Sequence, residues 1–342
     1  MKEADAALDV LFHPFETGAL AWPRAGGALF LRARDGWPLH ASARPGLVCE
    51  QTYKPEFDAL SRSGLEVVEE GAAPDTTFPL VLVLPPRQRD EARALFARAL
   101  DRAGEDGVVV ACMHNDEGAK TGQADLARVA GAVNVLSKHH CRVFWTGTRE
   151  DADDALRAQW RTLDAPRVVV EGLTSRPGVF AWDRVDAASA LLARHLPNDL
   201  AGEGADLGAG TGYLAREVLA RSPNVRMLDL YEAEARALAL AKINLAAHAN
   251  VGFHWHDVTQ GLQRSYDFIV MNPPFHAQGR ADRTDIGKRF IEVAAQSLVS
   301  RGRLYLVANR HLPYESVLDA RFGQVRTLAA QGGFKVIEAV RA

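Results

Sequence analysis

The sequence predicts an α/β protein built from two copies of one unit, each with a mostly parallel sheet that closes in an antiparallel hairpin. Two observations lead to this prediction. Short apolar runs typical of buried strands alternate with segments of helical spacing, which is the order that builds parallel sheets. The same order then occurs twice, and in each copy a strand ends at a Pro-Pro pair, first at Pro85 and again at Pro273.

The elements follow from these patterns. In the first half we expect strands at 27–34, 78–84 and 108–112, helices at 51–62 and around 92–100, and a hairpin of 133–137 with 141–145. The second half repeats the order with a strand at 268–271, a helix at 290–298, a strand at 304–308 and a hairpin of 325–328 with 334–337. Three more strands precede these at 202–205, 225–231 and 252–256. A linker expected at 163–177 separates domain 1–162 from domain 163–342.

Composition is that of a globular protein, with 47% hydrophobic and 24% charged residues among 342. Apolar runs stay shorter than the roughly 18 residues of a membrane-spanning helix, and the first residues lack the pattern of a signal peptide. The three cysteines, Cys49, Cys112 and Cys141, are widely spaced, which favours a reducing compartment and argues against a disulfide framework or a zinc site. We therefore expect a cytoplasmic protein with no membrane segment and no metal.

Charge differs between the two halves. Residues 1–165 hold 19 Lys and Arg against 25 Asp and Glu, whereas residues 166–342 hold 21 against 18. Because a polyanion is attracted to basic surface, the second half is the one expected to contact it.

A strand that stops at a rigid corner stands at the centre of the second half. The apolar run Phe268–Met271 ends at a Pro-Pro pair, and neither proline has a backbone N–H to donate to a ladder. Pro273 also holds Asn272 extended, at the carboxyl end of a strand, where open α/β sheets bind ligands. The amide of Asn272 beside the ring of Phe275 suits a planar base that carries an amino group. The alternative is a strand-ending turn with a buried phenylalanine.

A glycine-rich loop follows the strand at 202–205. Gly208, Gly210 and Gly212 give G-x-G-x-G, whereas a dinucleotide-binding fingerprint has G-x-G-x-x-G. Glycines permit a tight turn and a close approach of a ligand to the backbone. Asp206 stands at the end of the strand, where its carboxylate would repel a pyrophosphate. This carboxylate suits a ligand with an ammonium group and no phosphate, as in S-adenosylmethionine.

Two more acidic residues end the next two predicted strands. Glu232 is placed to accept hydrogen bonds from both ribose hydroxyls, and Asp257 from an adenine amino group. Asp229 competes with Glu232 for the ribose, and Glu232 also fits a helix-start carboxylate favoured by the helix dipole. His254 and His256 are explained by strand alternation without a metal.

With these residues in view, the sequence resembles class I S-adenosylmethionine-dependent methyltransferases that act on an amino nitrogen. The resemblance rests on 206–212 and on the Asn-Pro-Pro-Phe of 272–275. More narrowly, the chain is similar to the bacterial small-subunit ribosomal RNA guanine-N2 methyltransferases at 178–186, 272–276, 307–314 and 333–337. One departure is Ala188-Ser189, where that family usually has Gly-Ser.

The resemblance implies two tandem Rossmann-like methyltransferase domains, with 163–342 catalytic and 1–162 degenerate. In the first half Leu84 takes the place of Asn272. The activity implied is transfer of a methyl group from S-adenosylmethionine to the exocyclic N2 of a guanine in 16S ribosomal RNA. The residues implied to bind the cofactor are Asp206, Gly208, Ala209, Gly210, Gly212, Glu232, Asp257 and Asn272.

The resemblance also implies how the target base is held. The guanine would be flipped out of its stack, with its amino hydrogens accepted by Asn272 and by the carbonyl of Pro273, and with Phe275 stacked on the ring. Residues of the following loop become candidates for RNA contact: His276, Arg280, Arg283, Lys288 and Arg289. A solvated helix start is the alternative for these cations.

Two other functions stay open from the sequence. A methyltransferase of the same class can act on another planar amino group, such as the N2 of a 23S ribosomal RNA guanine, adenine N6 or a protein glutamine amide. A non-catalytic RNA-binding scaffold is the third possibility, but a scaffold has no need of Asp206, Glu232 or Asn272.

Overall fold

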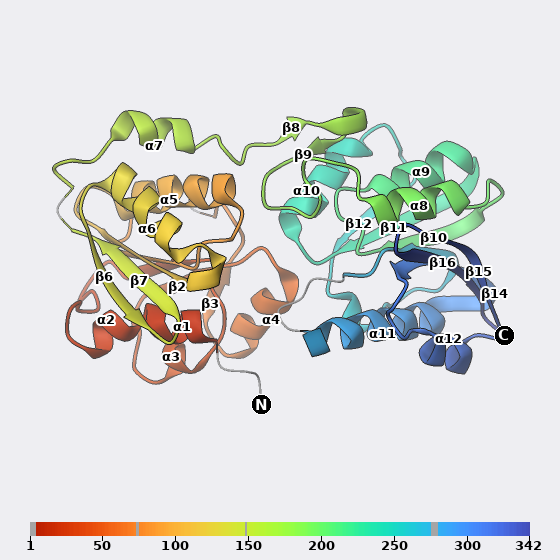
Figure 1. Cartoon of the computed structure of the whole chain (residues 1–342), viewed down its shortest axis with the longest axis horizontal. Coiled ribbons are helices and arrows are strands. Elements are labelled where there is room, and N and C mark those ends of the chain that lie inside the picture. Colours follow the sequence, from red (N-terminus) through yellow and green to blue (C-terminus); the bar gives the residue numbers. More distant parts are fainter. Residues whose placement is uncertain (1–4, 73–74, 148, 275–279) are drawn as a thin grey trace. The chain divides into compact units, whose positions relative to one another are not determined.

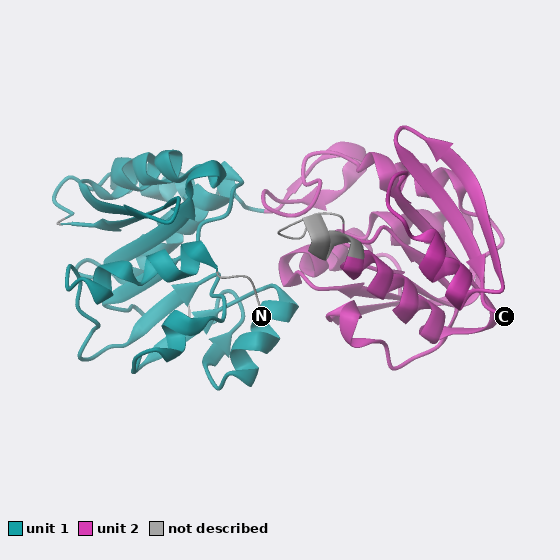
Figure 2. Cartoon of the chain, turned by 60° about the horizontal axis from the view of Figure 1, so that its bottom comes forward, with its two compact units in different colours: residues 1–165 teal, residues 166–342 magenta. Residues whose placement is uncertain are grey.

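A computed structural model describes residues 5–72, 75–147, 149–274 and 280–342, and the side chains of all of these except 280–284. The chain divides into two compact units, residues 1–165 and 166–342 (Figure 2). Each unit has its own sheet and its own helices (Figure 1).

The strands of the first unit are β1 (Ala28–Leu31), β2 (Leu47–Glu50), β3 (Glu66–Val68), β4 (Leu80–Val83), β5 (Val108–His114), β6 (Val133–Lys138) and β7 (Cys141–Thr146). Its helices are α1 (Ala6–Leu11), α2 (His13–Glu16), α3 (Trp37–His40), α4 (Lys54–Arg62), α5 (Arg89–Ala103), the short 3-10 helix η1 (Asn115–Glu117), α6 (Ala119–Ala130) and α7 (Asp154–Trp160). The first strand is shorter than predicted because the chain turns at Arg32, whose φ is 56°.

The second unit opens with a small ribbon of β8 (Arg167–Val168) and β9 (Thr174–Ser175), joined through η2 (Val170–Gly172). Its main strands are β10 (Ala201–Leu207), β11 (Asn224–Glu232), β12 (Val251–Trp255), β13 (Tyr266–Met271), β14 (Leu298–Asn309), β15 (Gln324–Gln331) and β16 (Phe334–Val340). Its helices are α8 (Ala187–His195), α9 (Tyr213–Arg221), α10 (Ala235–Asn244), η3 (Val258–Gln260), α11 (Arg280–Ser297) and α12 (Glu315–Arg321). Among the helices that the structure describes, none combines the length and apolar character needed to cross a membrane.

The two main sheets have the same topology. Their strand orders are β3-β2-β1-β4-β5-β7-β6 and β12-β11-β10-β13-β14-β16-β15. In both sheets the first five strands of that order pair in parallel and the last two form an antiparallel hairpin. The predicted α/β fold with two copies of one unit is therefore confirmed, and so are both closing hairpins.

Each sheet is covered by helices on both faces, as doubly wound parallel sheets require (Figure 1). In the second unit, alternate residues of β13 enter two different cores. Ile269 and Met271 pack with residues of α11 and α12, whereas Phe268 and Val270 pack with residues of α8 and α9. The continuous apolar run that predicts this strand is explained by burial on both faces.

Gly287 allows α11 to approach Tyr314, the residue that precedes α12. A Cβ at this position would overlap the hydroxyl oxygen of Tyr314 and lie 2.5 Å from the ring carbon that bears it. Tyr314 is fully buried between α11 and α12. Gly287 thus lets the helix that follows the Asn-Pro-Pro corner pack closely on this ring.

We predict that Gly287→Ala destabilises the protein, although the same change in an open helix stabilises by about 1 kcal/mol. The added methyl group overlaps a buried ring, and overpacking of this kind costs about 1–3 kcal/mol. Thermal and urea unfolding measure the loss. Gly122→Ala in α6 is the matched control, because its added methyl group meets the flexible end of Met113. A higher melting temperature for Gly287→Ala would contradict the close packing.

Candidate active site

Four parallel strands of the second unit deliver polar residues to one edge of the sheet. Leu207, at the end of β10, pairs with Tyr231 of β11 and with Met271 of β13. The residues that follow these three are Gly208, Glu232 and Asn272, so the register sets them side by side. Asp257 follows β12, the neighbour of β11. The four strand ends therefore meet at one edge of the sheet.

The glycine-rich loop is fastened to the end of β11. The backbone nitrogens of Gly208 and Ala209 both donate to the carbonyl of Tyr231, at 2.8 and 3.1 Å. The nitrogen of Gly210 donates to Oε2 of Glu232 at 2.7 Å. Gly210 has a φ of 56°, and a Cβ placed on it would meet no described atom within 4 Å. The loop therefore offers open backbone at the edge, and Gly212 leads from it into α9.

Asp206 lies beneath this loop with no exposed surface. Neither of its carboxylate oxygens has a hydrogen-bond partner within the described part of the chain. Burial raises the pKa of Asp206 to about 8; a contact with the backbone of Ala215, too poor in geometry to count as a hydrogen bond, opposes the rise, and the nearby charge of Glu232 adds to it. A cation placed beside this carboxylate would favour its ionised form. The site is thus suited to a ligand that carries an ammonium group.

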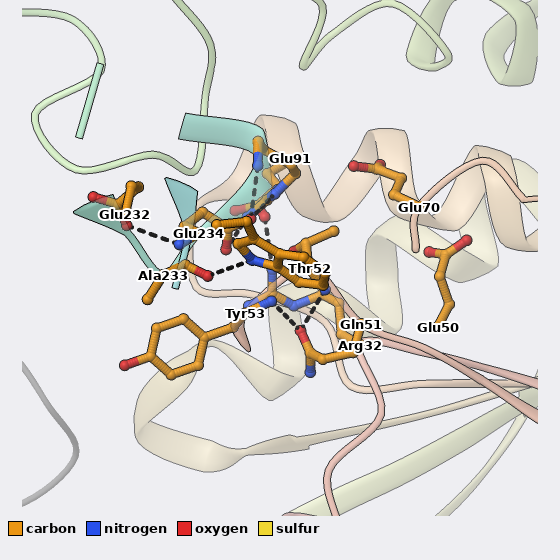
Figure 3. A network of polar contacts seen from close by, with 12 residues as sticks. Arg32, Glu50, Gln51, Thr52, Tyr53, Glu70, Glu91, Glu232, Ala233 and Glu234 are labelled. Carbon is orange, nitrogen blue, oxygen red and sulfur yellow. Dashed lines mark hydrogen bonds and ion pairs between the residues drawn. The ribbon is translucent and has the colours of Figure 1, made fainter. Parts of the chain in front are cut away.

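Glu232 is held from both sides by backbone amides. Its Oε1 accepts from the nitrogen of Glu234 at 2.8 Å (Figure 3), and Oε2 accepts from Gly210 as described above. Burial raises the pKa of Glu232, and these backbone hydrogen bonds oppose the rise. Each oxygen keeps a further lone pair, so the fixed carboxylate can accept from two neighbouring hydroxyls.

Asp257 caps the short helix η3. Its Oδ1 accepts from the nitrogen and the hydroxyl of Thr259 at 2.9 and 2.7 Å, and Oδ2 accepts from Gln260 at 3.2 Å. The carboxylate is therefore oriented by its own turn at the edge of the sheet.

Asn272 has a defined amide orientation. Its Nδ2 donates to Oδ2 of Asp186 at 2.9 Å and to Oγ of Ser189 at 2.8 Å. A carboxylate only accepts, which identifies the nitrogen side of the amide. Its Oδ1 is buried and has no partner among the described residues. Pro273 is buried and Pro274 is exposed. The corner thus presents one buried acceptor that awaits a donor.

The predicted RNA-contact residues are only partly described. Phe275 and His276 lie outside the described residues, and so do the side chains of Arg280 and Arg283 in the first turns of α11. Lys288 lies further along α11 and is partly buried.

Arg289 is engaged within the protein. Its Nε donates to the carbonyl of Thr259 at 2.9 Å, and Nη1 lies 3.3 Å from Oε2 of Glu292. This arginine ties α11 to η3, so part of its side chain serves the fold.

Asp229, the alternative ribose acceptor, and the two histidines of β12 and its end make other contacts. Asp229 is buried and accepts from Arg264 at 2.7 Å and from the hydroxyl of Tyr266 at 2.8 Å. His254 lies 3.1 Å from the other oxygen of Asp229, and His256 lies 2.7 Å from the carbonyl of Gly261. Among the described residues, His, Cys, Asp and Glu form no group of three or more that is suited to a metal.

Two further residues hold the site in place, and the sequence alone does not mark either of them as a site residue. Asn244 donates to the carbonyls of Thr211 and Thr174 at 2.9 and 3.0 Å, which locks the glycine loop to β9. Asp186 holds Asn272 and also caps α8, where its Oδ2 accepts from the nitrogen of Ser189 at 2.9 Å. An aspartate before an apolar run is a signal for a helix start, which makes Asp186 recognisable as a cap.

The first unit offers an internal comparison. Leu31 ends β1 as Leu207 ends β10, and their pairing partners occupy matching positions. By this match, Phe30 occupies the position of Asp206, and Arg32 that of Gly208. Gln51 occupies the position of Glu232, and Leu84 that of Asn272. Arg32 keeps a left-handed φ of 56°, close to the 74° of Gly208. The first unit keeps the backbone course, but it has phenylalanine at the position of the buried carboxylate of Asp206 and leucine at the position of the amide of Asn272.

Comparison with known proteins places the chain in a family. The methyltransferase small domain family matches residues 171–338. Ribosomal RNA small subunit methyltransferase C of Shewanella pealeana is 30% identical over 273 residues, which are 78% of this chain and 79% of the relative. The protein of the same name from Psychromonas ingrahamii is 28% identical over 78% of this chain and 77% of the relative.

A solved structure resembles the whole fold. The T. thermophilus 16S rRNA N2 G1207 methyltransferase in complex with AdoMet and guanosine has a TM-score of 0.81 and 22% sequence identity, over 99% of this chain and 92% of that chain. Both units are thus shared with that protein. Taken with the sequence similarity over most of both chains, this shows that the chain belongs to the ribosomal RNA small subunit methyltransferase C family.

Proposed function

We propose that this enzyme transfers a methyl group from S-adenosylmethionine to the exocyclic N2 of a guanine in 16S ribosomal RNA. The observation that carries the proposal is the buried Oδ1 of Asn272, which has no partner among the described residues, at the same sheet edge as the buried carboxylate of Asp206. One group awaits a hydrogen-bond donor and the other a cation. An amino group on the acceptor and an ammonium group on the cofactor would satisfy both.

The cofactor fits the residues present at this edge. Asp206 would hold the ammonium group, Glu232 the ribose hydroxyls and Asp257 the adenine amino group. The open backbone at Gly210 leaves room for close approach. When bound, the cofactor supplies an electrophilic methyl group on a sulfonium. The T. thermophilus protein to which this chain is similar is described as a complex with AdoMet and guanosine.

The residues of the corner would orient the acceptor. Oδ1 of Asn272 accepts one hydrogen of the guanine amino group, and the carbonyl of Pro273 accepts the other. This turns the nitrogen lone pair away from the corner and toward the methyl group. Phe275, which lies outside the described residues, would stack on the flipped base. The amino group can lose its proton to water after attack, so positioning supplies most of the rate.

Ribosomal RNA as substrate agrees with the charge of the second unit, where cations outnumber anions by 21 to 18. We assign phosphate contact to Arg280, Arg283 and Lys288 first, and to Arg289 only in part because of its internal bonds. A ribosomal RNA substrate also implies a cytoplasmic enzyme. The scaffold alternative leaves unexplained why Asp206 is fully buried with no cation or side-chain partner in the described part of the chain.

We predict that Asn272→Ala lowers kcat at least about 100-fold, because the guanine amino group loses its fixed acceptor. The dissociation constant for S-adenosylmethionine should change by less than about threefold, since Asp206 and Glu232 stay in place. Nucleoside mass spectrometry of 16S ribosomal RNA treated with enzyme measures N2-methylguanosine. Turnover equal to wild type would remove Asn272 from the mechanism. Methyladenosine as the product would instead favour another amino acceptor.

A second prediction concerns pH. The pKa of Asp206 is raised to about 8 in the folded protein, so ionisation opposes folding increasingly as pH rises from about 4 to about 8. Asp206→Asn, which has no charge to bury, should therefore melt above the cofactor-free wild type at pH 9 and close to it at pH 4. The variant should also lose the rise in melting temperature that S-adenosylmethionine gives to wild type.

The matched control is Asp229→Asn, in a second buried aspartate of the same sheet. Asp229 has Arg264 and Tyr266 as partners, so its replacement should lower the melting temperature. Differential scanning calorimetry from pH 4 to 9 tests both variants. A lower melting temperature for Asp206→Asn at pH 9 would show that the ionised carboxylate is compensated in the free enzyme.

A further inference from the structure

The amide of Asn272 is held by two residues at the start of α8. Both hydrogens of its nitrogen are used, one by Oδ2 of Asp186 and one by Oγ of Ser189. These partners lie 86 and 83 residues before Asn272 in the sequence. The oxygen of the amide is left as a buried acceptor among the described residues.

We propose that Asp186 and Ser189 are positioning residues that fix the amide of Asn272 with its oxygen toward the acceptor base. The inference rests on the proposed function and names two further residues on which methyl transfer depends. Neither residue has to touch the reacting atoms in this role. Both act through the orientation of Asn272.

Asn272 needs these two partners, called the clamp below, because the two ends of an amide have nearly the same shape. The torsion that turns an asparagine amide is broad and nearly two-fold, so oxygen and nitrogen exchange places at little energetic cost. With the nitrogen forward, Asn272 would present a donor to the guanine amino group, which is also a donor. The base would then be repelled, or turned with its lone pair away from the methyl group.

The two partners contribute differently. A carboxylate only accepts, so Asp186 determines which side of the amide faces it, and its charge strengthens the bond. A hydroxyl both donates and accepts, so Ser189 restrains the amide without selecting its sense. We therefore expect loss of Asp186 to be the more severe change.

The clamp stands on a rigid support. Oδ2 of Asp186 also accepts from the backbone nitrogen of Ser189 at 2.9 Å, so the same oxygen caps α8 and holds Asn272. Leu191 and Leu192 of this helix are buried in the core on one face of the sheet. α8 packs against β14 and β16. The helix start therefore moves with the sheet that carries Asn272.

The first unit provides independent support for the pairing of these residues. Its α1 packs against β5 and β7 as α8 packs against β14 and β16. Asp5 caps α1 through the nitrogen of Leu8 at 3.1 Å, so Asp5 matches Asp186 and Leu8 matches Ser189. In this unit the amide position is Leu84, and Leu8 and Leu84 are both buried in one core. The first unit thus has leucine in place of both the amide and its hydroxyl partner, whereas it keeps an aspartate as the helix cap.

The test uses substitutions that keep the helix start intact. Asp186→Ser retains a good capping residue but removes the carboxylate, and Ser189→Ala removes the hydroxyl from a helical position that alanine favours. Ser189→Thr restores a hydroxyl and serves as the rescue. Asp5→Ser is the matched control, because it changes the cap of the corresponding helix in the first unit, where no amide is held.

Four quantities are measured on the full-length variants. They are kcat for methyl transfer to 16S ribosomal RNA, the dissociation constant for S-adenosylmethionine, and the dissociation constants for guanosine and for inosine with S-adenosylhomocysteine bound. Inosine lacks the N2 amino group, so a preference for guanosine reports the acceptor that Asn272 presents. Melting temperatures exclude loss of folding as the cause of a change.

We expect Asp186→Ser and Ser189→Ala to lower kcat by on the order of 10- to 100-fold, with cofactor affinity and melting temperature near those of wild type. The preference for guanosine over inosine should shrink in both variants and return in Ser189→Thr. Asp5→Ser should leave kcat unchanged.

Three outcomes would overturn the inference. Wild-type kcat and guanosine preference in both variants would show that Asn272 needs no clamp. Weaker cofactor binding with unchanged kcat at saturation would make Asp186 and Ser189 cofactor ligands instead. A wild-type enzyme that transfers no methyl group to guanine N2 would remove the proposed function, and the inference with it.

Discussion

Parallel pairing of β10 with β11 and β13 is the constraint on which the site depends. Because these strands run in the same direction and end at the same level, the three residues after Leu207, Tyr231 and Met271 are neighbours without any long connection. A slip of one residue in either pairing would send every side chain of that strand to the other face. The apolar residues on both faces of the sheet oppose such a slip, so the two cores hold the chemical groups in register.

A comparison of the two units shows which features of the site belong to the shared backbone. Both have the same strand order, the Pro-Pro corner and a left-handed residue after the first central strand. The chemistry differs at few positions: a buried phenylalanine and a buried leucine replace the carboxylate and the amide of the second unit. The same backbone course therefore forms without these groups, so a comparison of the two units separates residues that shape the backbone from residues proposed to meet a ligand.

The sequence was sufficient for the fold class, for both closing hairpins and for the residues that end strands, but it did not predict the short strands β2 and β3. Asn272 and Glu232 are recognisable because each ends a predicted strand at a turn, and the glycine loop because of its own G-x-G-x-G spacing; all three are local signals. The helix start at Asp186 carries a local signal too, but its contact with Asn272 spans 86 residues, and Asn244 reaches Thr174 across 70. Neither pairing has a periodicity or a spacing that marks it. They arise only when the sheet brings distant turns together.

Burial of Asp206 affects how the binding of an ammonium group would depend on pH. With a pKa of about 8, this group is mostly a neutral acid at pH 7 while no cation is beside it. Occupation by an ammonium group converts it to a carboxylate, so binding releases a proton and affinity rises with pH up to that pKa. The methylated cofactor and its demethylated product carry the same ammonium group. In its proposed role Asp206 would contribute equally to the affinity for both, and their discrimination would have to arise elsewhere, at the sulfur.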